Sequence, residues 1–201
     1  MKRPVQALTF ILSLALASPA ALAVNAGEQA PDFALTDLAG KPVKLSDHKG
    51  STVVLEWVNP ECPYVRKHYD SANMPNLQRE FGGKKVVWLT INSTNANHPE
   101  FKNPGQMSSW MKQKGGTPAA TLLDSDGKVG KLYGARTTPH MYIVDAKGKL
   151  VYVGAIDDKR STNPEDVKTS KNHVRAALGE VLAGKPVGVA STTPYGCTVK
   201  Y

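Results

Sequence analysis

The stretch WVNPECPYVRKHYD, residues 57–70, holds Cys62, one of only two cysteines in the 201-residue chain. The residues that lead into it, STVVLEWV, are mostly apolar and β-branched, and this composition predicts a buried strand. A helix is predicted from about Pro63, because proline is favoured in the first helical turn, where its missing N–H costs nothing. Cys62 is therefore expected where a buried strand gives way to a helix.

Two positions are open for the start of that helix. Either Asn59 is the N-cap and Pro60 the first helical residue, or Cys62 is the N-cap and Pro63 the first. In both cases unpaired backbone N–H groups and the positive end of the helix dipole face the sulfur. Both arrangements favour the thiolate over the thiol.

The charged neighbours of Cys62 act in opposite directions. Arg66, four residues on, should lie on the same helical face and favour the thiolate, whereas the adjacent Glu61 opposes it. His68 is six residues on and should point elsewhere, so it is not proposed as a base.

The first 23 residues have the pattern of a secretory signal peptide. Two basic residues precede a short apolar run, and the segment ends in Ala21-Leu22-Ala23, a small-x-small cleavage pattern. We expect an exported protein, periplasmic if the source is a Gram-negative bacterium, that begins at Val24 and keeps no stable membrane insertion. An uncleaved anchor is the alternative.

Removal of residues 1–23 from the 201 leaves 178, one domain of ordinary size. Without Lys2 and Arg3, 23 basic residues remain against 17 acidic ones, a net charge of +6. The basic residues are scattered among acids, which indicates a solvated surface and no nucleic-acid partner. In an oxidising compartment the two cysteines can pair and stay paired.

The rest of the chain predicts an α/β sheet covered by helices on both sides. A tail, residues 188–201, has no periodicity. The expected elements are a hairpin over 33–47, strands over 51–58 and 84–93, a helical stretch over 63–81 interrupted at Pro75, a helix over 105–115, a strand, turn and helix over 120–134, a hairpin over 140–158, a loop over 159–168 and a helix over 170–187.

Four segments carry a family resemblance: NPECPYV, TTPHMYIVDAKGKLVYVGAIDD, LAGKPV and GCTVKY. Together they resemble exported thioredoxin-like redoxins, grouped with the alkyl hydroperoxide reductase and thiol-specific antioxidant proteins. The resemblance implies a thioredoxin-like domain over 24–187, with a central mixed sheet, an N-terminal β-hairpin and an irregular tail. It also implies that Thr138-Pro139 is a cis-proline loop beside the Cys62 sulfur.

The chain departs from both patterns of that superfamily. Thioredoxins use Cys-x-x-Cys, but Asn59 occupies the first position here, so Cys62 matches the second cysteine. Peroxiredoxins use Pro-x-x-x-Thr-x-x-Cys, and here Leu55 replaces the proline and Asn59 the threonine. Their arginine is also missing, and Arg66 or Arg136 is the available substitute.

Cys197 lies in a glycine-containing tail that no predicted element holds, so the tail is either mobile or held in place by other contacts. If it reaches Cys62, the two form a redox couple in which Cys62 is the reactive thiol and Cys197 resolves the disulfide. A permanent disulfide is the alternative, and closure of the loop from residue 62 to 197 would stabilise the fold by up to roughly 5 kcal/mol. We favour the redox couple, because a site that favours the thiolate is unnecessary for a structural link.

The function expected from these features is a thiol oxidoreductase of peroxiredoxin-like type, without a cofactor. Its substrates would be hydroperoxides or protein thiols and disulfides, and an unidentified thiol reductant would recycle it. A catalytically silent binding module with a structural disulfide is one alternative. Another is a copper-chaperone-like protein, but Cys62 with His140 or His68 makes a poor metal cage, and no metal site is expected.

Overall fold

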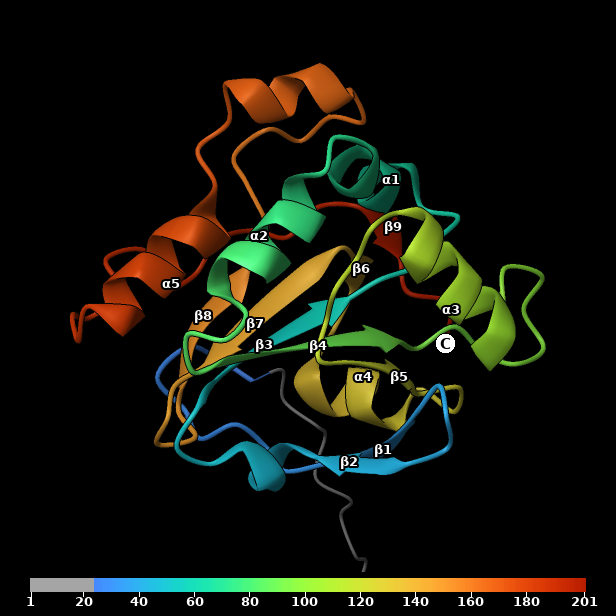
Figure 1. The fold of residues 1–201 in the computed structure, drawn as a ribbon, viewed down its shortest axis with the longest axis horizontal. Helices are drawn as coiled ribbons and strands as arrows, with labels where there is room; N and C mark the ends of the chain where they lie inside the picture. The colour runs from blue at the N-terminus through green and yellow to red at the C-terminus, as the bar shows by residue number, and fades with distance from the viewer. Residues whose placement is uncertain (1–23) are drawn as a thin grey trace, which may run out of the picture.

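The computed structural model describes residues 24–201, which form an α/β fold around one mixed sheet (Figure 1). The sheet has seven strands in the order β2-β1-β5-β4-β3-β7-β8. The signal peptide expected over residues 1–23 lies outside the described residues. The strands of this sheet are β1 (Ala34–Asp37), β2 (Pro42–Lys44), β3 (Thr52–Trp57), β4 (Val86–Asn92), β5 (Ala120–Leu123), β7 (His140–Val144) and β8 (Leu150–Gly154).

The centre of the sheet follows from its composition. Every residue of β3 is buried, as the apolar run STVVLEWV predicts, since it pairs with β4 on one side and β7 on the other. The β3–β4 and β4–β5 pairs are parallel, whereas β3–β7 and β7–β8 are antiparallel. The expected mixed sheet is therefore confirmed.

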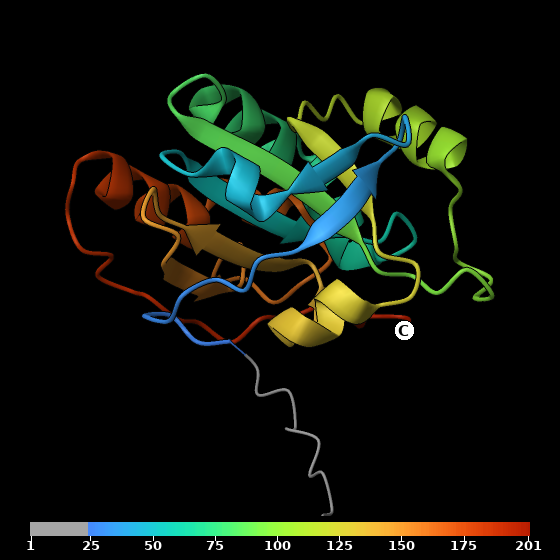
Figure 2. The same cartoon turned by 90° about the horizontal axis from the view of Figure 1, so that it is seen from below.

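Helices cover both faces of the sheet (Figures 1 and 2). Buried side chains of α1, α2, α3 and α5 share one core cluster with Val54 and Ile143, and those of α4 share the opposite cluster with Leu55 and Trp57. Alternate residues of β3 thus serve opposite layers. The helices are α1 (Pro63–Asp70), α2 (Asn73–Phe81), α3 (Pro104–Gln113), α4 (Lys128–Tyr133) and α5 (His173–Leu182), with 3-10 helices at Leu45–His48 and Pro164–Lys168.

The helical stretch expected over 63–81 breaks at a different place from the one predicted. It separates into α1 and α2 at Ala72, which has φ = 56°, in the left-handed region. Pro75 lies inside the first turn of α2, where its missing N–H leaves no hydrogen bond unmade. The prediction that the helical stretch is interrupted at Pro75 was therefore wrong.

Two segments expected to be irregular contain regular structure. The loop over 159–168 includes the 3-10 helix Pro164–Lys168, which is capped by the Asn163 side chain. In the tail, β9 (Cys197–Thr198) pairs with β6 (Thr137–Thr138) in a separate two-stranded sheet. Within residues 24–201, no helix is long and apolar enough to cross a membrane.

Candidate active site

Cys62 is the N-cap of α1, and Pro63 is the first residue of that helix. The structure thus selects the second of the two registers that the sequence left open. The backbone N–H of Cys62 donates to the Asn59 carbonyl at 3.0 Å, which closes a tight turn after β3, and the Cys62 carbonyl accepts from the N–H of Arg66 at 2.9 Å. The Cys62 sulfur therefore lies at the end of α1 where backbone N–H groups are unpaired.

The sulfur of Cys62 is buried against the loop that precedes β7. Cys62 is 1% exposed, and its Sγ donates to the carbonyl oxygen of Thr138 at 2.9 Å. The peptide bond between Thr138 and Pro139 is cis, as the resemblance implied. The prediction that this loop faces the sulfur is confirmed.

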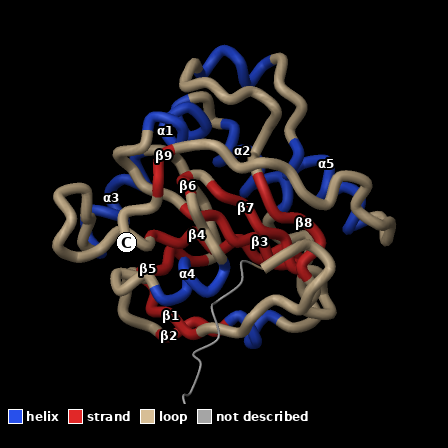
Figure 3. The backbone as a smooth tube through the Cα atoms, turned by 180° about the vertical axis from the view of Figure 1, so that it is seen from behind, coloured by secondary structure: helices blue, strands red, loops and turns tan. Residues whose placement is uncertain are grey.

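Cys197, which belongs to the tail, lies against the same loop before β7. In the antiparallel pair of β6 and β9, Cys197 lies opposite Thr138 (Figure 3). Gly196, with φ = 143°, permits this approach, because a Cβ atom there would lie 2.0 Å from the Thr138 oxygen. Both cysteines are free thiols.

The Cys62 side chain affects the titration of Cys197. Burial, and then hydrogen bonding and charge interaction with Cys62, raise the pKa of Cys197 to about 12. Cys197 is more exposed than Cys62, since it is only partly buried. The sequence left the tail either mobile or held in place, and the structure holds its sulfur beside Cys62.

Further contacts hold the tail beyond Cys197. The Val199 N–H donates to the Arg136 carbonyl at 3.1 Å, and the Asn95 N–H donates to the Lys200 carbonyl at 2.7 Å. The Tyr201 hydroxyl donates to the Ala135 carbonyl at 2.6 Å. The expectation that no regular element holds the tail was wrong, because its backbone pairs with segments far away in the chain.

Asn59, which occupies the position of the first thioredoxin cysteine, is part of the turn. Its Oδ1 accepts from the Glu61 N–H at 2.8 Å, and its Nδ2 donates to Glu100 Oε2 at 2.6 Å. The side chain is buried, and both of its polar atoms are bonded within the domain. Asn59 thus shapes the loop that carries Cys62.

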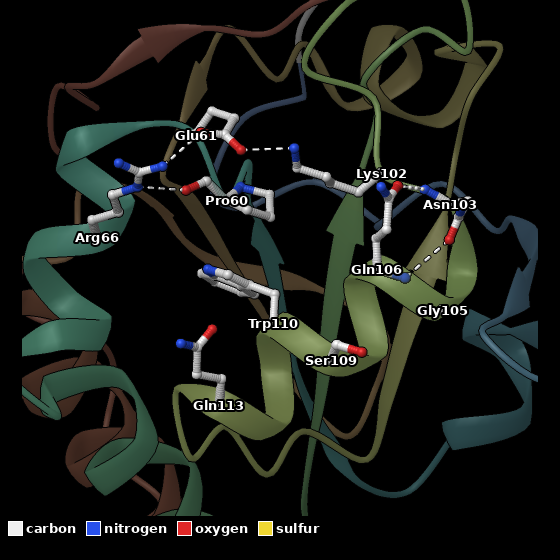
Figure 4. Close-up of a pocket in the computed structure, with 10 residues that line it drawn as sticks. All are labelled: Pro60, Glu61, Arg66, Lys102, Asn103, Gly105, Gln106, Ser109, Trp110 and Gln113. Carbon is white, nitrogen blue, oxygen red and sulfur yellow. Dashed lines mark hydrogen bonds and ion pairs between the residues drawn. The ribbon is translucent and has the colours of Figure 1, made fainter.

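Arg66 lies on the outer side of the same loop. Its Nε donates to the Pro60 carbonyl at 2.9 Å, and its Nη2 pairs with Glu61 Oε2 at 2.6 Å (Figure 4). Lys102 pairs with the other oxygen of Glu61 at 2.7 Å, and Lys102 and then Arg66 hold the pKa of the Glu61 carboxyl below its usual value. The guanidinium therefore stabilises the loop, and its charge is largely neutralised by the Glu61 carboxylate. Arg136, the other substitute considered, is exposed.

A cleft of about 510 Å³ adjoins this loop, between the start of α1 and α3 (Figure 4). Most of its lining residues are polar or charged, and Trp110 is the one aromatic side chain among them. Neither cysteine is among the described residues that line it. The cleft lies next to the turn that carries Cys62 and does not include that residue.

Two histidines near the site are buried and neutral. Burial lowers the pKa of His68 to about 4 and that of His140 to about 3. His68 is bonded to Tyr195 and Asn73, and His140 Nδ1 contacts the Tyr142 hydroxyl at 3.1 Å. Within residues 24–201, no group of three His, Cys, Asp or Glu side chains could hold a metal ion.

The sequence did not predict a cluster of buried polar side chains around Tyr195, two residues before Cys197. Lys67, His68 and Asp157 are each at most 1% exposed, and they surround the hydroxyl of Tyr195. Asp157 lies at the end of the hairpin predicted over 140–158, where a carboxylate is ordinarily solvated. A lysine on a short helix gives no signal that its ammonium group is buried.

Comparisons with known proteins agree with this geometry. The model of the AhpC/TSA family matches residues 26–153, a segment that includes Cys62 and Pro139 and ends before Cys197. The thioredoxin-like protein YneN of Bacillus subtilis is 30% identical over 146 residues, which cover 72% of this chain and 81% of that one. The thiol-disulfide oxidoreductase ResA of Halalkalibacterium halodurans is 28% identical over 129 residues, 64% of this chain and 68% of the relative.

A solved structure is similar over most of the chain. The uncharacterized conserved protein from Geobacillus kaustophilus superposes with a TM-score of 0.76 at 32% identity, and the match covers 88% of this chain and 92% of that one. Since the family model spans well over half of the 201 residues, and the cis-proline loop faces the helix-capping cysteine, the chain belongs to the AhpC/TSA family and has a thioredoxin-like fold.

Proposed function

We propose that this protein is a thiol–disulfide oxidoreductase in which Cys62 is the reactive thiol and Cys197 the resolving thiol. One observation carries the proposal: Thr138 accepts a hydrogen bond from the Cys62 sulfur and pairs with Cys197 across β6 and β9. The two thiols thus meet at one residue, next to the cis-proline. The N-terminal segment, residues 1–23, supports a further proposal that the protein is exported.

The exchange proceeds in two steps. Cys62 loses its proton and attacks one sulfur of a partner disulfide, whose other sulfur leaves as a thiolate. Cys197 then loses its proton and attacks the Cys62 sulfur, which releases the partner's second sulfur. The partner gains two electrons and two protons, and the S–S bond between Cys62 and Cys197 replaces the one that was broken.

The raised pKa of Cys197 supports its role as the resolving thiol. Burial and then the neighbouring Cys62 side chain raise that pKa, so Cys197 holds its proton more tightly than an ordinary cysteine. Part of this rise comes from Cys62 itself, and that part changes once Cys62 is bonded to a partner. Cys197 is more exposed than Cys62, so we expect a thiol reductant to attack the disulfide at Cys197.

Protein disulfides are better supported as substrates than hydroperoxides. A peroxidatic site needs hydrogen-bond donors aimed at the two peroxide oxygens, one of which bonds to sulfur while the other leaves. The two candidate donors, Asn59 and Arg66, have other partners. Asn59 is bonded to Glu100 and Glu61, and Arg66 is paired with Glu61. The name of ResA, a thiol-disulfide oxidoreductase, supports the same choice.

A purely structural disulfide is less well supported. Val199, Lys200 and Tyr201 hold the tail through hydrogen bonds in the absence of a disulfide. A covalent link is not needed to place the tail on the domain. The binding module that contains such a link is therefore the second choice.

The test combines Cys62→Ser and Cys197→Ser variants with a disulfide-containing protein substrate. Wild-type protein should turn over, Cys197→Ser should accumulate a mixed disulfide at Cys62, and Cys62→Ser should be inactive. A parallel challenge with a hydroperoxide should give slower oxidation. Wild-type activity in Cys62→Ser would refute the proposal. Fast hydroperoxide turnover without protein-disulfide exchange would show that hydroperoxides, and not protein disulfides, are the substrates.

A further inference from the structure

A buried polar cluster ties the tail to α1, the helix that carries Cys62 at its start. Its members, called here the Tyr195 cluster, are Lys67 and His68 of α1, Asp157 after β8, and Tyr195 of the tail. Tyr195 is 4% exposed and the other three at most 1%. Only Gly196 separates Tyr195 from Cys197.

The hydroxyl of Tyr195 lies at the centre of the cluster. It donates to Asp157 Oδ1, contacts His68 Nε2 at 3.1 Å and lies 3.5 Å from Lys67 Nζ. Lys67 Nζ also pairs with Asp157 Oδ2 at 3.4 Å and donates to the Lys159 carbonyl at 2.6 Å. The tail is thus bonded to two separate parts of the domain through one side chain.

The direction of the hydrogen bonds is defined by the neighbours of His68. Asn73 Nδ2 lies 2.8 Å from His68 Nδ1, and Asn73 Oδ1 accepts from Asn172, so the Asn73 amide donates to Nδ1. The neutral imidazole then carries its proton on Nε2 and donates to the Tyr195 oxygen. Tyr195 in turn donates to Asp157, and burial and then this carboxylate raise the pKa of Tyr195 well above its usual value.

The phenol ring is held as firmly as its hydroxyl. Tyr64 contacts it edge to face, with ring centroids 5.7 Å apart, and Lys67 Nζ lies 5.6 Å from the ring centroid. Tyr64 and Lys67 both belong to α1, as does the N-cap Cys62. One short helix therefore sets the position of both sulfurs.

A buried ion pair does not by itself explain this arrangement. The cost of removing Lys67 and Asp157 from water is commonly as large as their attraction, unless further hydrogen bonds satisfy both groups. The Tyr195 hydroxyl supplies one of those bonds to Asp157. The cluster is therefore complete only when the tail is seated.

We propose that Tyr195 is a positioning residue that, through Lys67, His68 and Asp157, keeps Cys197 beside Cys62 while the disulfide is open. This deepens the proposed function and rests on it. A seated tail has already lost its conformational freedom, so closure of the Cys62–Cys197 bond costs little entropy. The effective concentration of Cys197 at Cys62 is then high, and the mixed disulfide resolves quickly.

The test is the equilibrium between the dithiol and disulfide forms in glutathione buffers. Tyr195→Phe keeps the ring and removes the hydroxyl, and should lower the equilibrium constant for disulfide formation by about tenfold or more. Tyr133→Phe is the matched control, since its buried hydroxyl donates to the Pro31 carbonyl on the other face of the sheet. It should leave the constant unchanged, and an equal loss in both variants, or none in Tyr195→Phe, would overturn the proposal.

Amide hydrogen exchange of the reduced wild-type protein gives a second readout that needs no variant. The proposal predicts protection at Val199, whose N–H is bonded to Arg136, while the cysteines are reduced. Exchange at the rate of an unfolded peptide would overturn it. If protection is found but no disulfide forms in any buffer, the cluster holds the tail and the proposed redox couple is wrong.

Discussion

Cys62 and Cys197 lie side by side, but different kinds of contact hold them. Cys62 is placed by its own neighbours: the strand β3 ends before it, the turn to Asn59 closes on it and Pro63 starts the helix after it. Cys197 is placed by β6, by α1 and by the loop after β8, all far away in sequence. The first position is encoded locally, whereas the second exists only in the folded molecule.

This contrast predicts which changes alter the reactivity of one thiol and which disrupt the pairing of Cys62 with Cys197. Changes near Cys62 should alter the reactivity of a thiol that stays in place. Changes around β9 should instead separate the two thiols while the domain remains folded.

Gly196→Ala should detach Cys197 from Cys62. Backbone strain at φ = 143° costs about 1–3 kcal/mol, and the new Cβ would meet the Thr138 oxygen at 2.0 Å, so β9 should leave β6. Disulfide formation in glutathione buffers should fall by about a hundredfold or more. Gly27→Ala is the control, because Gly27 also has a positive φ, 101°, but faces open space. Equal effects in the two variants would mean that the close approach at Thr138 is unimportant.

Glu56→Gln should stabilise the domain at neutral and alkaline pH without affecting the tail. Glu56 is buried in β3, where Trp88 and Tyr69 donate to it, and burial raises its pKa to about 7. The native state therefore binds a proton more tightly than the unfolded chain, and stability falls as pH rises from about 4.5 to above 7. Removal of this titration should raise the free energy of unfolding at pH 8 by up to about 3 kcal/mol relative to wild type.

Denaturant melts of wild type and Glu56→Gln between pH 4.5 and pH 8.5 check this. The two curves should converge at the acid end and separate towards the alkaline end. Parallel curves would show that Glu56 does not titrate in this range. A change in the disulfide equilibrium of this variant would contradict the separation between domain and tail.

Arg66→Gln should have the smallest effect. The guanidinium is half exposed and paired with Glu61, and an exposed ion pair is worth about 0–1 kcal/mol. The rate of Cys62 alkylation at fixed pH, measured on a Cys197→Ser background, should change by less than about threefold. A loss of more than about tenfold would show that the charge of Arg66 stabilises the Cys62 thiolate, as the sequence suggested.

The same contrast explains what the sequence could predict. The buried strand and the helix start after it follow from local patterns, although these left the N-cap open between Asn59 and Cys62, and the loop at Pro139 follows from the family resemblance. Pro75 misled the prediction of the α1–α2 boundary, because proline is tolerated in a first turn as well as at a break.

The tail could not be predicted in the same way. A two-residue strand such as β9 has no periodicity, and its partner is β6, some 60 residues earlier. The burial of Lys67 and Asp157 depends on Tyr195, and no local pattern links these three positions. Only Gly196 gave a signal, as a glycine next to a cysteine, and that signal indicated mobility where the structure has a close approach.

The most direct test of the account is a redox titration of the wild-type protein, with rapid thiol alkylation and mass measurement at each buffer ratio. The account predicts that Cys62 and Cys197 lose their reactivity together, in one two-electron transition within a single chain, while the domain stays folded in both forms. Independent alkylation of the two thiols at every ratio, a disulfide between two chains, or unfolding of the domain on reduction would contradict it.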